Sequence, residues 1–549
     1  MKHLSRHAKR ARVTRPSPSS AKEHAGGGDL ISGLCDDLLV RILELVADDS
    51  ARDAVRTGAL SRRWRGLWAR VPGLRFASWP EFKSAGGVRR FIDLVDGVLA
   101  LRASAAQPPD AGVMKHLEIA LRAYRAPGPG KKQRLVVQSV RAAEGWARYA
   151  ARHGVRSFVL NLRLPLKQWQ DQGDDDDYDN DDDWEKETPP LMTLGDLPSS
   201  AKLETMYLAL AGARLRLPAT AVFESLVDLT LRHIEVSPRG GRLLARLVSP
   251  ACCPRLQKLR LVRIRGLKKL VLDTGSLLEL SVAYSCVMGS VELKTPNLRV
   301  LHFDDDSYFE VLTGSAPRLE ELAIQCGGFP IDINDGDLSC VRSLKFELLS
   351  HRDGDDDDGG SNEDTISLLE RCTSARDLVV YLDVPERQER RQDLIRDGMP
   401  QLPHITSLAV HFSYELHSVG DGVASLLTRF KNIRYLRIQV VDFFVEEDYS
   451  RRVADNFVCD HPEEDWKSND ISLAHLEEAE FTGLTGTKCE LRFLQFVLAS
   501  AKDLRKLVIR FSDMCSLVGK RDYFEHMLIE GGMWTPCCDT NESYEWRPS

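Results

Sequence analysis

The sequence contains too few cysteines and too short apolar runs for several classes of protein. Its 549 residues include 12 Cys, far below the roughly 8–10% of disulfide-rich secreted scaffolds, so we expect a reducing compartment. No apolar run approaches the roughly 18 residues that a membrane-spanning helix needs. The first residues are basic and no apolar stretch follows them, so we expect no secretory signal peptide and no membrane partner.

The sequence also lacks the motifs of common enzyme classes. It contains no G-x-S-x-G, no H-E-x-x-H, no G-x-x-x-x-G-K-[ST] and no C-x-x-C. Cys252-Cys253 and Cys537-Cys538 are adjacent pairs, which is poor spacing for a tetrahedral zinc site. Cys459 and His461 are spaced for a metal, but we favour a structural pair there. We therefore predict a protein that is not an enzyme and needs neither cofactor nor metal.

Charge is concentrated in three segments. Residues 1–24 carry seven Lys or Arg and one Glu, residues 174–183 carry eight Asp, and residues 353–358 carry five Asp. These segments account for the whole net charge of -7, so the remaining body is neutral. A neutral body with 7% aromatic residues offers no basic groove, and we expect no nucleic-acid partner.

The like charges in these segments repel one another and bury little surface. We therefore predict that residues 1–27 form a disordered basic arm. The acidic stretches 171–187 and 352–363 are predicted to be solvated insertions. The cluster Lys9-Arg10-Ala11-Arg12 fits a nuclear localisation signal as well as an unstructured extension, so we expect the protein in the nucleus, the cytoplasm or both.

Three short helices are predicted between residues 30 and 71. Asp36 is placed to cap the first helix, and Ser50 and Ser61 are placed to cap the next two. Apolar residues follow at helical spacing in the first helix, at Leu38, Ile42, Leu45 and Val46, and in the third, at Trp64, Leu67, Trp68 and Val71. Such a small unit cannot bury this much apolar surface alone, so the surplus packs on the following domain or on a partner.

This segment resembles the F-box of plant proteins. The resemblance rests on Leu34-Cys35-Asp36-Asp37-Leu38-Leu39-Val40-Arg41-Ile42-Leu43 and on Leu60-Ser61-Arg62-Arg63-Trp64-Arg65-Gly66-Leu67-Trp68. It implies that residues 28–75 are a three-helix F-box domain that binds a Skp-type adaptor and, through it, cullin and RING subunits. Cys35 stands where the family has Pro, which leaves the strength of binding open. The resemblance places ten residues at or directly behind the adaptor surface: Leu34, Asp36, Leu38, Leu39, Ile42, Leu43, Val55, Leu60, Trp64 and Leu67.

A pattern of apolar-x-x-apolar-x-apolar recurs between residues 114 and 438. From Leu261 to Phe346 its last position advances by 21, 21, 21 and 22 residues, within the roughly 20–29 of leucine-rich repeats. The alternation indicates a short strand with one buried face in each unit, and stacked strands form a curved solenoid. We predict that residues 110–445 form an irregular leucine-rich-repeat region interrupted by the acidic insertions.

The residues between the apolar positions are predicted to line the concave face of this solenoid. A polar face on a rigid array suits the recognition of another protein, although each residue fits a merely solvated surface equally well. The candidate substrate face comprises Arg232, Lys258, Arg260, Glu279, His302, Asp304 and Glu321.

The C-terminal region is similar to the FBD domain that follows leucine-rich repeats in many plant F-box proteins. Leu476-x-x-Ala479-x-Phe481 and Leu504-x-x-Leu507-x-Ile509 predict two strands, with an amphipathic helix from Glu490 to Ala499 between them. Cys459 and Trp466 stand upstream, as in that family. We place the FBD domain at residues 455–515, as a cap on the solenoid, and a tail at residues 516–549.

The fold class predicted is α+β, with a three-helix F-box, an irregular α/β leucine-rich-repeat solenoid and a C-terminal FBD cap. The resemblance implies a substrate-recognition adaptor of an SCF-type cullin–RING ubiquitin ligase, which would hold an unknown protein for ubiquitination and degradation. Two alternatives stay open at this point. The chain fits a protein-interaction scaffold outside any ligase, or a small-molecule receptor built on the same repeats.

Overall fold

A computed structural model of the chain describes most of the sequence between residues 31 and 548. The described residues are 31, 33–78, 85–104, 114–123, 129–163, 191–193, 202–216, 222–236, 241–284, 288–304, 309–325, 331–353, 362–383, 391–413, 421–441, 470–484, 488–512, 532–536 and 543–548. The predictions for the basic arm, for the Asp run 174–183, for Cys459, His461 and Trp466 and for Cys537-Cys538 lie outside these residues, as does most of the insertion 352–363.

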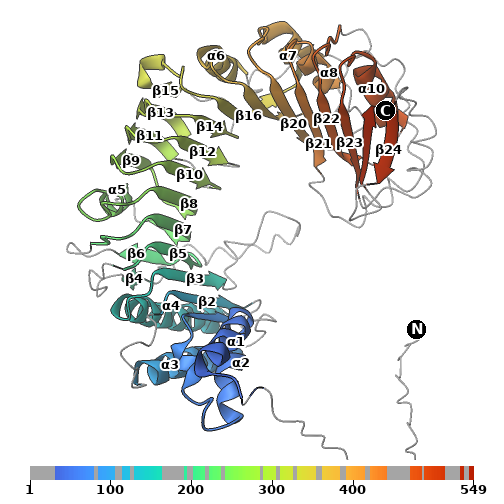
Figure 1. The fold of residues 1–549 in the computed structure, drawn as a ribbon. Helices are drawn as coiled ribbons and strands as arrows, with labels where there is room; N and C mark the ends of the chain where they lie inside the picture. Colours follow the sequence, from blue (N-terminus) through green and yellow to red (C-terminus); the bar gives the residue numbers. More distant parts are fainter. Residues whose placement is uncertain are drawn as a thin grey trace, which may run out of the picture.

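A 19-stranded sheet dominates the arc-shaped molecule and follows its inner side (Figure 1). Most of its strands are parallel and neighbour one another in the order in which they occur in the chain. They are β1 (Gly73–Ala77), β2 (His116–Arg122), β3 (Ser157–Arg163), β5 (Thr205–Leu210), β7 (Asp228–Glu235), β8 (Lys258–Arg265), β10 (Glu279–Ala283), β12 (Val300–Asp304), β14 (Glu321–Ile324), β16 (Ser343–Leu349), β18 (Asp377–Asp383), β20 (Ser407–Ser413), β21 (Tyr435–Val441), β22 (Glu478–Leu484) and β23 (Lys506–Phe511). The short strands β4 (Leu191–Thr193) and β6 (Arg214–Arg216) pair with each other, and β6 joins β7.

The evenly spaced repeats stack in register, as their 21-residue period predicts. Leu259, Leu280, Leu301, Leu322 and Leu344 are aligned from β8 to β16, and all are buried. Each repeat from β8 to β14 sends a second strand to the outer side of the arc. These strands, β9 (Lys269–Asp273), β11 (Met288–Lys294), β13 (Phe309–Ser315) and β15 (Ile331–Ile333), form a parallel four-stranded sheet. Two short strands joined by turns need few residues, which explains the short period.

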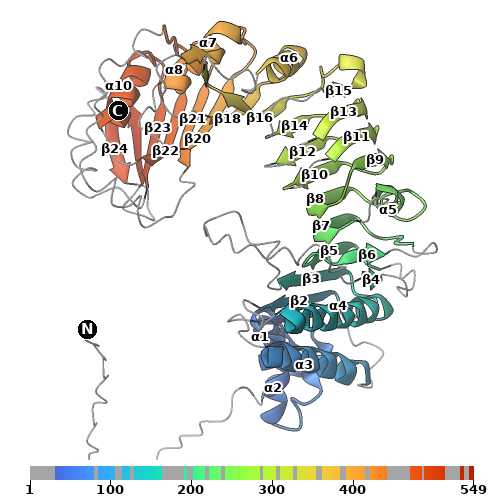
Figure 2. The ribbon, with the colours of Figure 1, turned by 180° about the vertical axis from the view of Figure 1, so that it is seen from behind.

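Helices replace the outer strands in many of the longer repeats. They lie on the outer side of the arc in both views (Figures 1 and 2). They are α3 (Ala85–Ser104), α4 (Pro129–Arg152), α5 (Gly241–Leu247), α6 (Glu363–Arg371), α7 (Leu394–Gly398), α8 (Asp421–Leu427) and α10 (Lys488–Ala499). A 3-10 turn, η5 (Asn334–Gly336), and an antiparallel pair, β17 (His351–Asp353) with β19 (Arg391–Asp393), complete the outer layer. The mixed α/β architecture, with one long and mostly parallel sheet, is compatible with a leucine-rich-repeat solenoid.

The N-terminal segment differs in detail from the three helices expected. It forms α1 (Asp36–Asp49), α2 (Ala51–Arg56) and a 3-10 turn, η1 (Thr57–Ala59). In place of a third α-helix, turns lead to a second 3-10 segment, η2 (Leu67–Arg70). Ser50 caps α2, since its hydroxyl accepts from the N–H of Asp53 at 3.3 Å. Asp36 does not cap α1, because Cys35 holds the cap position and Asp36 is already helical.

The C-terminal region continues the same sheet. The expected strand–helix–strand unit is present as β22, α10 and β23. Beyond it, β25 (Ser543–Pro548) pairs antiparallel with β23, and β24 (Gly532–Pro536) pairs antiparallel with β25. Part of the region expected as a tail therefore belongs to the sheet and provides its last two strands.

A change in the leucine stack should cost far more stability than a change beside it. We expect Leu301→Ala to lower the free energy of unfolding by about 2–5 kcal/mol, because Leu301 is fully buried and neither neighbour can fill the cavity. Val300→Ala, on the half-buried face of the same strand, should change it by roughly 0.5 kcal/mol or less. Urea unfolding followed by circular dichroism measures both, and equal losses would contradict the assignment of the two faces.

Arg102, in the last turn of α3, is a buried cation. Its side chain is 2% exposed, and its Nη1 and Nη2 have no hydrogen-bond partner among the residues that the structure describes. Burial lowers the pKa of Arg102 to about 10, an effect that Tyr149 of α4 opposes. The guanidinium therefore weakens the packing of this helix layer.

Arg102→Met should stabilise the protein. We expect the free energy of unfolding to rise by about 1–4 kcal/mol, because the apolar chain is kept and an unpaired buried charge is removed. Arg141→Met on α4, where the arginine is exposed, is the matched control and should change little. A loss of stability in Arg102→Met alone, measured by the same urea titration, would show that the guanidinium is compensated.

Candidate functional site

Helix α1 is apolar on two faces, and only one of them is buried. Leu39, Leu43 and Ala47 face the core and are at most 1% exposed. Leu38 and Ile42, which directly precede these two buried leucines in the sequence, point away from the core and are 51% and 38% exposed. A helix that is hydrophobic on both sides is stable in water only where its outer side is small or covered by another molecule.

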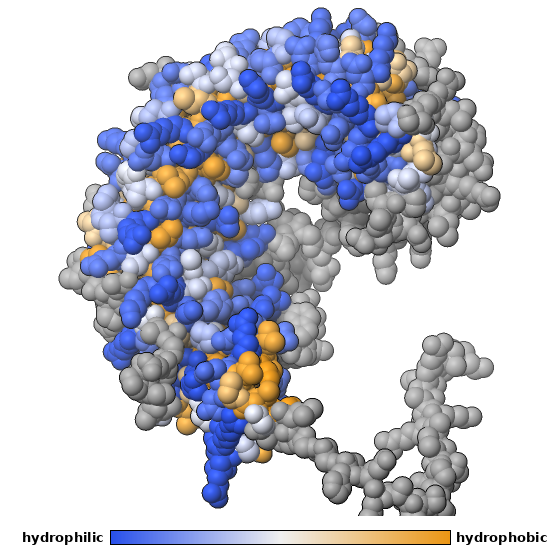
Figure 3. All heavy atoms as spheres, in the orientation of Figure 1, coloured by the Kyte–Doolittle hydropathy of each residue, from blue (hydrophilic) through white to orange (hydrophobic). Residues whose placement is uncertain are grey.

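The exposed side of α1 belongs to a larger apolar patch. We define this docking patch by the large apolar side chains exposed between residues 31 and 60, at the N-terminal end of the arc, which are Ile31, Leu38, Ile42, Leu45 and Leu60. Leu45 and Leu60 are the most exposed of them, at 62% and 69%. Hydrophobic residues gather at this end of the molecule in the space-filling view (Figure 3). Contiguous exposed apolar surface of this kind is typical of protein interaction sites.

The structure divides the ten residues that the sequence assigns to an adaptor surface. Three are exposed leucine or isoleucine side chains of the docking patch, at Leu38, Ile42 and Leu60. Four others are buried behind it: Leu39, Leu43, Trp64 and Leu67. Leu34 and Val55 are half-buried, and Asp36 is exposed. Leu45 and Ile31 belong to the docking patch but not to the ten predicted residues, although the helical spacing of Leu45 from Leu38 and Ile42 already indicates a shared face.

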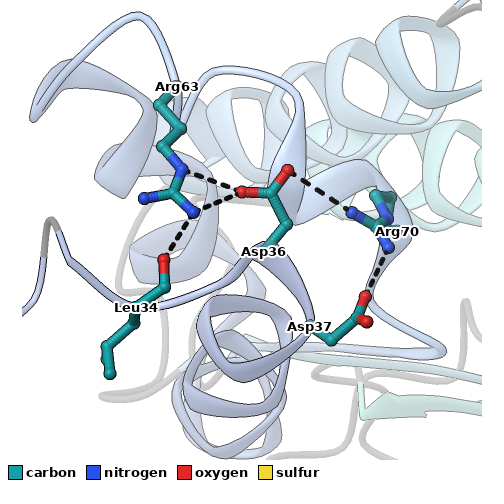
Figure 4. A network of polar contacts seen from close by, with 5 residues as sticks. All are labelled: Leu34, Asp36, Asp37, Arg63 and Arg70. Carbon is teal, nitrogen blue, oxygen red and sulfur yellow. Dashed lines mark hydrogen bonds and ion pairs between the residues drawn. The ribbon is translucent and has the colours of Figure 1, made fainter.

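An ionic network fixes the start of α1 to the segment after α2 (Figure 4). Asp36 accepts from Nε of Arg63 at 2.8 Å and lies 2.6 Å from its Nη2, which also donates to the carbonyl of Leu34 at 2.5 Å. Arg70 donates to Asp37 at 2.9 Å. Single exposed pairs contribute little, but charges that share partners hold a fixed geometry. The network therefore sets the position of Leu34 beside the docking patch.

The docking patch is joined directly to the solenoid. Trp64, Leu67 and Trp68 belong to the same buried cluster as Leu74 and Phe76 of β1. Helices α1 and α2 both pack against β1, and β1 pairs with β2. The first strand of the solenoid is therefore part of the core that supports the docking patch.

The concave face carries the seven residues expected to recognise a substrate. Their strands are β7, β8, β10, β12 and β14, and the ladder register aligns the residues in three rows. The first row contains Lys258, Glu279 and Glu321, the second contains Arg260 and His302, and the third contains Arg232 and Asp304.

Two short contacts join residues of these rows, one within the first row and one between the second row and the first. Nζ of Lys258 lies 2.7 Å from Glu279, and Nε2 of His302 lies 2.8 Å from Glu321. Among the residues that the structure describes, Arg260 forms no ion pair. Its charge lowers the pKa of Asp228 on β7, but burial of that carboxyl dominates and raises its pKa. The face is therefore positive on β7 and β8 and mostly paired beyond them.

A second cluster lies farther along the concave face. The rings of Tyr381 and His411 stack with centroids 4.9 Å apart, and Nζ of Lys345 lies 5.0 Å from the centre of the Tyr381 ring. Burial, with the nearby charges of Arg437 and Lys345, lowers the pKa of His411. Arg437 in turn lies 3.8 Å from Glu480. None of these residues belongs to the predicted substrate face, although each stands between apolar ladder positions.

Neither a metal centre nor a membrane-crossing helix is found in the described part of the chain. No group of three His, Cys, Asp or Glu side chains there is arranged to hold a metal ion. Cys252 and Cys253 are buried and free. None of the described helices is long and apolar enough to cross a membrane.

Two family models match parts of the chain. Residues 178–331 match a family model described as the LRR repeats of FBD-associated F-box protein At5g56370, and residues 472–509 match the FBD model. The first of these segments includes the evenly spaced strands from β8 to β14, and the second includes β22, α10 and most of β23.

Two relatives from Arabidopsis thaliana cover most of the chain. The putative F-box/FBD/LRR-repeat protein At4g03220 is 22% identical over 89% of this chain and 90% of its own length. The FBD-associated F-box protein At5g60610 is 23% identical over 87% of this chain and 98% of its own. A shorter stretch of 76 residues is 41% identical to F-box/FBD/LRR-repeat protein At1g80470 of the same plant. The resemblance seen in the sequence is thus confirmed, and the chain is a relative of the plant F-box proteins that carry leucine-rich repeats and an FBD domain.

Proposed function

We propose that this protein is a substrate-recognition adaptor of an SCF-type cullin–RING ubiquitin ligase. In this proposal the docking patch binds a Skp-type adaptor, and the concave face of the solenoid binds the protein to be ubiquitinated. The chain does no bond chemistry. It raises the effective concentration of the target's lysines near the ubiquitin-charged enzyme.

The exposed apolar stripe of α1 is the observation that carries the proposal. Leu38, Ile42 and Leu45 are exposed on a helix whose opposite face is fully buried. The family names of the relatives include the F-box, and F-box proteins generally bind Skp-type adaptors. An apolar centre surrounded by charged side chains such as Asp36, Arg63 and Arg41 has the anatomy of a protein interface.

Truncating the docking patch should abolish adaptor binding without unfolding the protein. We expect Leu38→Ser combined with Leu60→Ser to weaken co-purification with a recombinant Skp-type adaptor at least tenfold, because apolar anchors dominate such interfaces. The thermal midpoint should change little, since both side chains are mostly exposed.

The matched control is Leu101→Ser combined with Met533→Ser. These apolar side chains are 58% and 68% exposed but lie on α3 and β24, outside the docking patch. Equal losses in both double variants would mean that binding is non-specific. Full binding by the Leu38 and Leu60 variant would reject the proposal and favour a scaffold that does not enter a ligase.

Cys35→Pro should restore the family residue without strain. The φ angle of Cys35 is -69°, close to the value of about -65° that proline imposes. We expect the variant to be more stable by about 0.4–1 kcal/mol, because proline restricts the unfolded chain, and to bind the adaptor at least as tightly as Cys35 does. A lower thermal midpoint would show that the N–H of Cys35 or the conformation of Leu34 is needed.

A further inference from the structure

Three residues of the repeats share a backbone conformation that their side chains disfavour. His233, Arg263 and Tyr284 have φ angles of 51°, 54° and 50°, in the left-handed region that favours glycine. Each such residue costs conformational free energy and persists only where the surrounding structure imposes it. They occur at the same place in successive repeats, directly after aligned residues of β7, β8 and β10.

The left-handed residue shifts the alternation of buried side chains by one position in β7 and β8 alike, because Leu231 and Ile234 are both buried, as are Leu261 and Ile264. Pairing between β7 and β8 aligns Arg232 with Val262 and resumes with Ile234 and Ile264. Both isoleucines are buried at 1% exposure, so the core register is kept and the skipped side chain is released from the core. A bulge-like irregularity of this kind redirects a side chain and bends the strand.

The released side chains form a column of cationic and aromatic groups. Nε of Arg232 donates to Nε2 of His233 at 3.2 Å. The guanidinium of Arg263 lies 5.1 Å from the centre of the Tyr284 ring, and Tyr284 is 38% exposed. A bend alone would be cheaper with glycine, whereas this column supplies an imidazole, a guanidinium and a phenol.

The surface beside this column has an excess of positive charge. Arg260, on the concave face of β8, has no ion pair among the described residues. Glu279 is already paired with Lys258. Burial dominates and raises the pKa of Asp228, although this carboxyl is near enough for the charges of Arg260 and Lys258 to lower its pKa. Three cations, Arg232, Lys258 and Arg260, therefore face two carboxylates here. We call Arg232, His233, Arg260, Arg263 and Tyr284 together the bulged edge.

We propose that the bulged edge binds an acidic, unstructured segment of a partner protein. Carboxylates of this segment pair with Arg260 and Arg232, because planar guanidinium groups match carboxylates in geometry and charge. An apolar side chain of the segment packs on the ring of Tyr284, which loses little conformational freedom on binding. The inference rests on the proposed function in that this partner is the protein held for ubiquitination.

Fluorescence anisotropy with the full chain tests this site directly. The probe is a labelled peptide of alternating Glu and Ser, with the Gln and Ser peptide as its neutral control. We expect the acidic peptide alone to bind, with an affinity that falls as salt rises, and Arg260→Gln to weaken it about tenfold. Arg505→Gln, an exposed arginine near β23, should leave the affinity unchanged. Binding that is equally weakened by both variants, or no binding at all, overturns the proposal.

A glycine variant separates recognition from backbone bending. Combining His233→Gly, Arg263→Gly and Tyr284→Gly keeps the left-handed conformation available, so the thermal midpoint should be kept or raised. Peptide affinity should nevertheless fall at least tenfold. Unchanged affinity in this variant would show that the three side chains do not contact the peptide.

The outcome is independent of the docking patch. The Leu38→Ser and Leu60→Ser variant should bind the acidic peptide as the unmodified chain does. The adaptor co-purification experiment therefore tests the ligase assignment. If the unmodified chain binds the adaptor but not the acidic peptide, only the proposal for the bulged edge is rejected.

Discussion

Every other feature of the fold depends on contact between equivalent apolar side chains of neighbouring strands. Leu280, Leu301 and Leu322 are aligned across β10, β12 and β14 and are at most 1% exposed. Because each repeat contacts only its neighbours, stability is close to a sum over successive interfaces. The same strand register that aligns the leucines also aligns the polar residues of the concave face. The arrangement of Lys258, Arg260 and Glu279 is therefore a consequence of packing on the opposite face.

An array of parallel strands leaves two open edges, and the chain covers them with different devices. At one end α1 and α2 pack against β1, and at the other β25 and β24 add antiparallel strands. Exposed strand edges promote unwanted pairing, so such coverings keep a solenoid soluble. Helix α1 combines two roles, since its buried face stabilises the first strand while its outer face remains free for a partner.

The period of the leucines predicted the regular repeats, because burial alternates along a strand whatever its partners are. Apolar spacing also located Trp64, Leu67 and Trp68 in the core, but it did not predict their conformation. The spacing of apolar residues indicates which side chains are buried. It does not indicate the turn around Arg63, which depends on hydrogen bonds to Asp36 and to the carbonyl of Leu34, residues distant in the sequence. The strand β1 was overlooked although Val71-Pro-Gly-Leu74-Arg-Phe76 carries the repeat pattern. The left-handed positions are not occupied by glycine, so the sequence does not predict them and only the backbone angles of the structure identify them.

The continuous core between the N-terminal helices and β1 has a consequence for the distance between the docking patch and the concave face. Val71 and Leu74 are both buried in that core, so no loose linker separates the docking patch from the solenoid. Each repeat gained or lost between the two would move a bound partner by one strand spacing of about 4.8 Å and turn it by about 20–25°. The distance and the orientation of a bound partner relative to the docking patch therefore change together, in steps of one repeat. Under the proposed function, two relatives that bind the same segment in different repeats would present different lysines to the same enzyme.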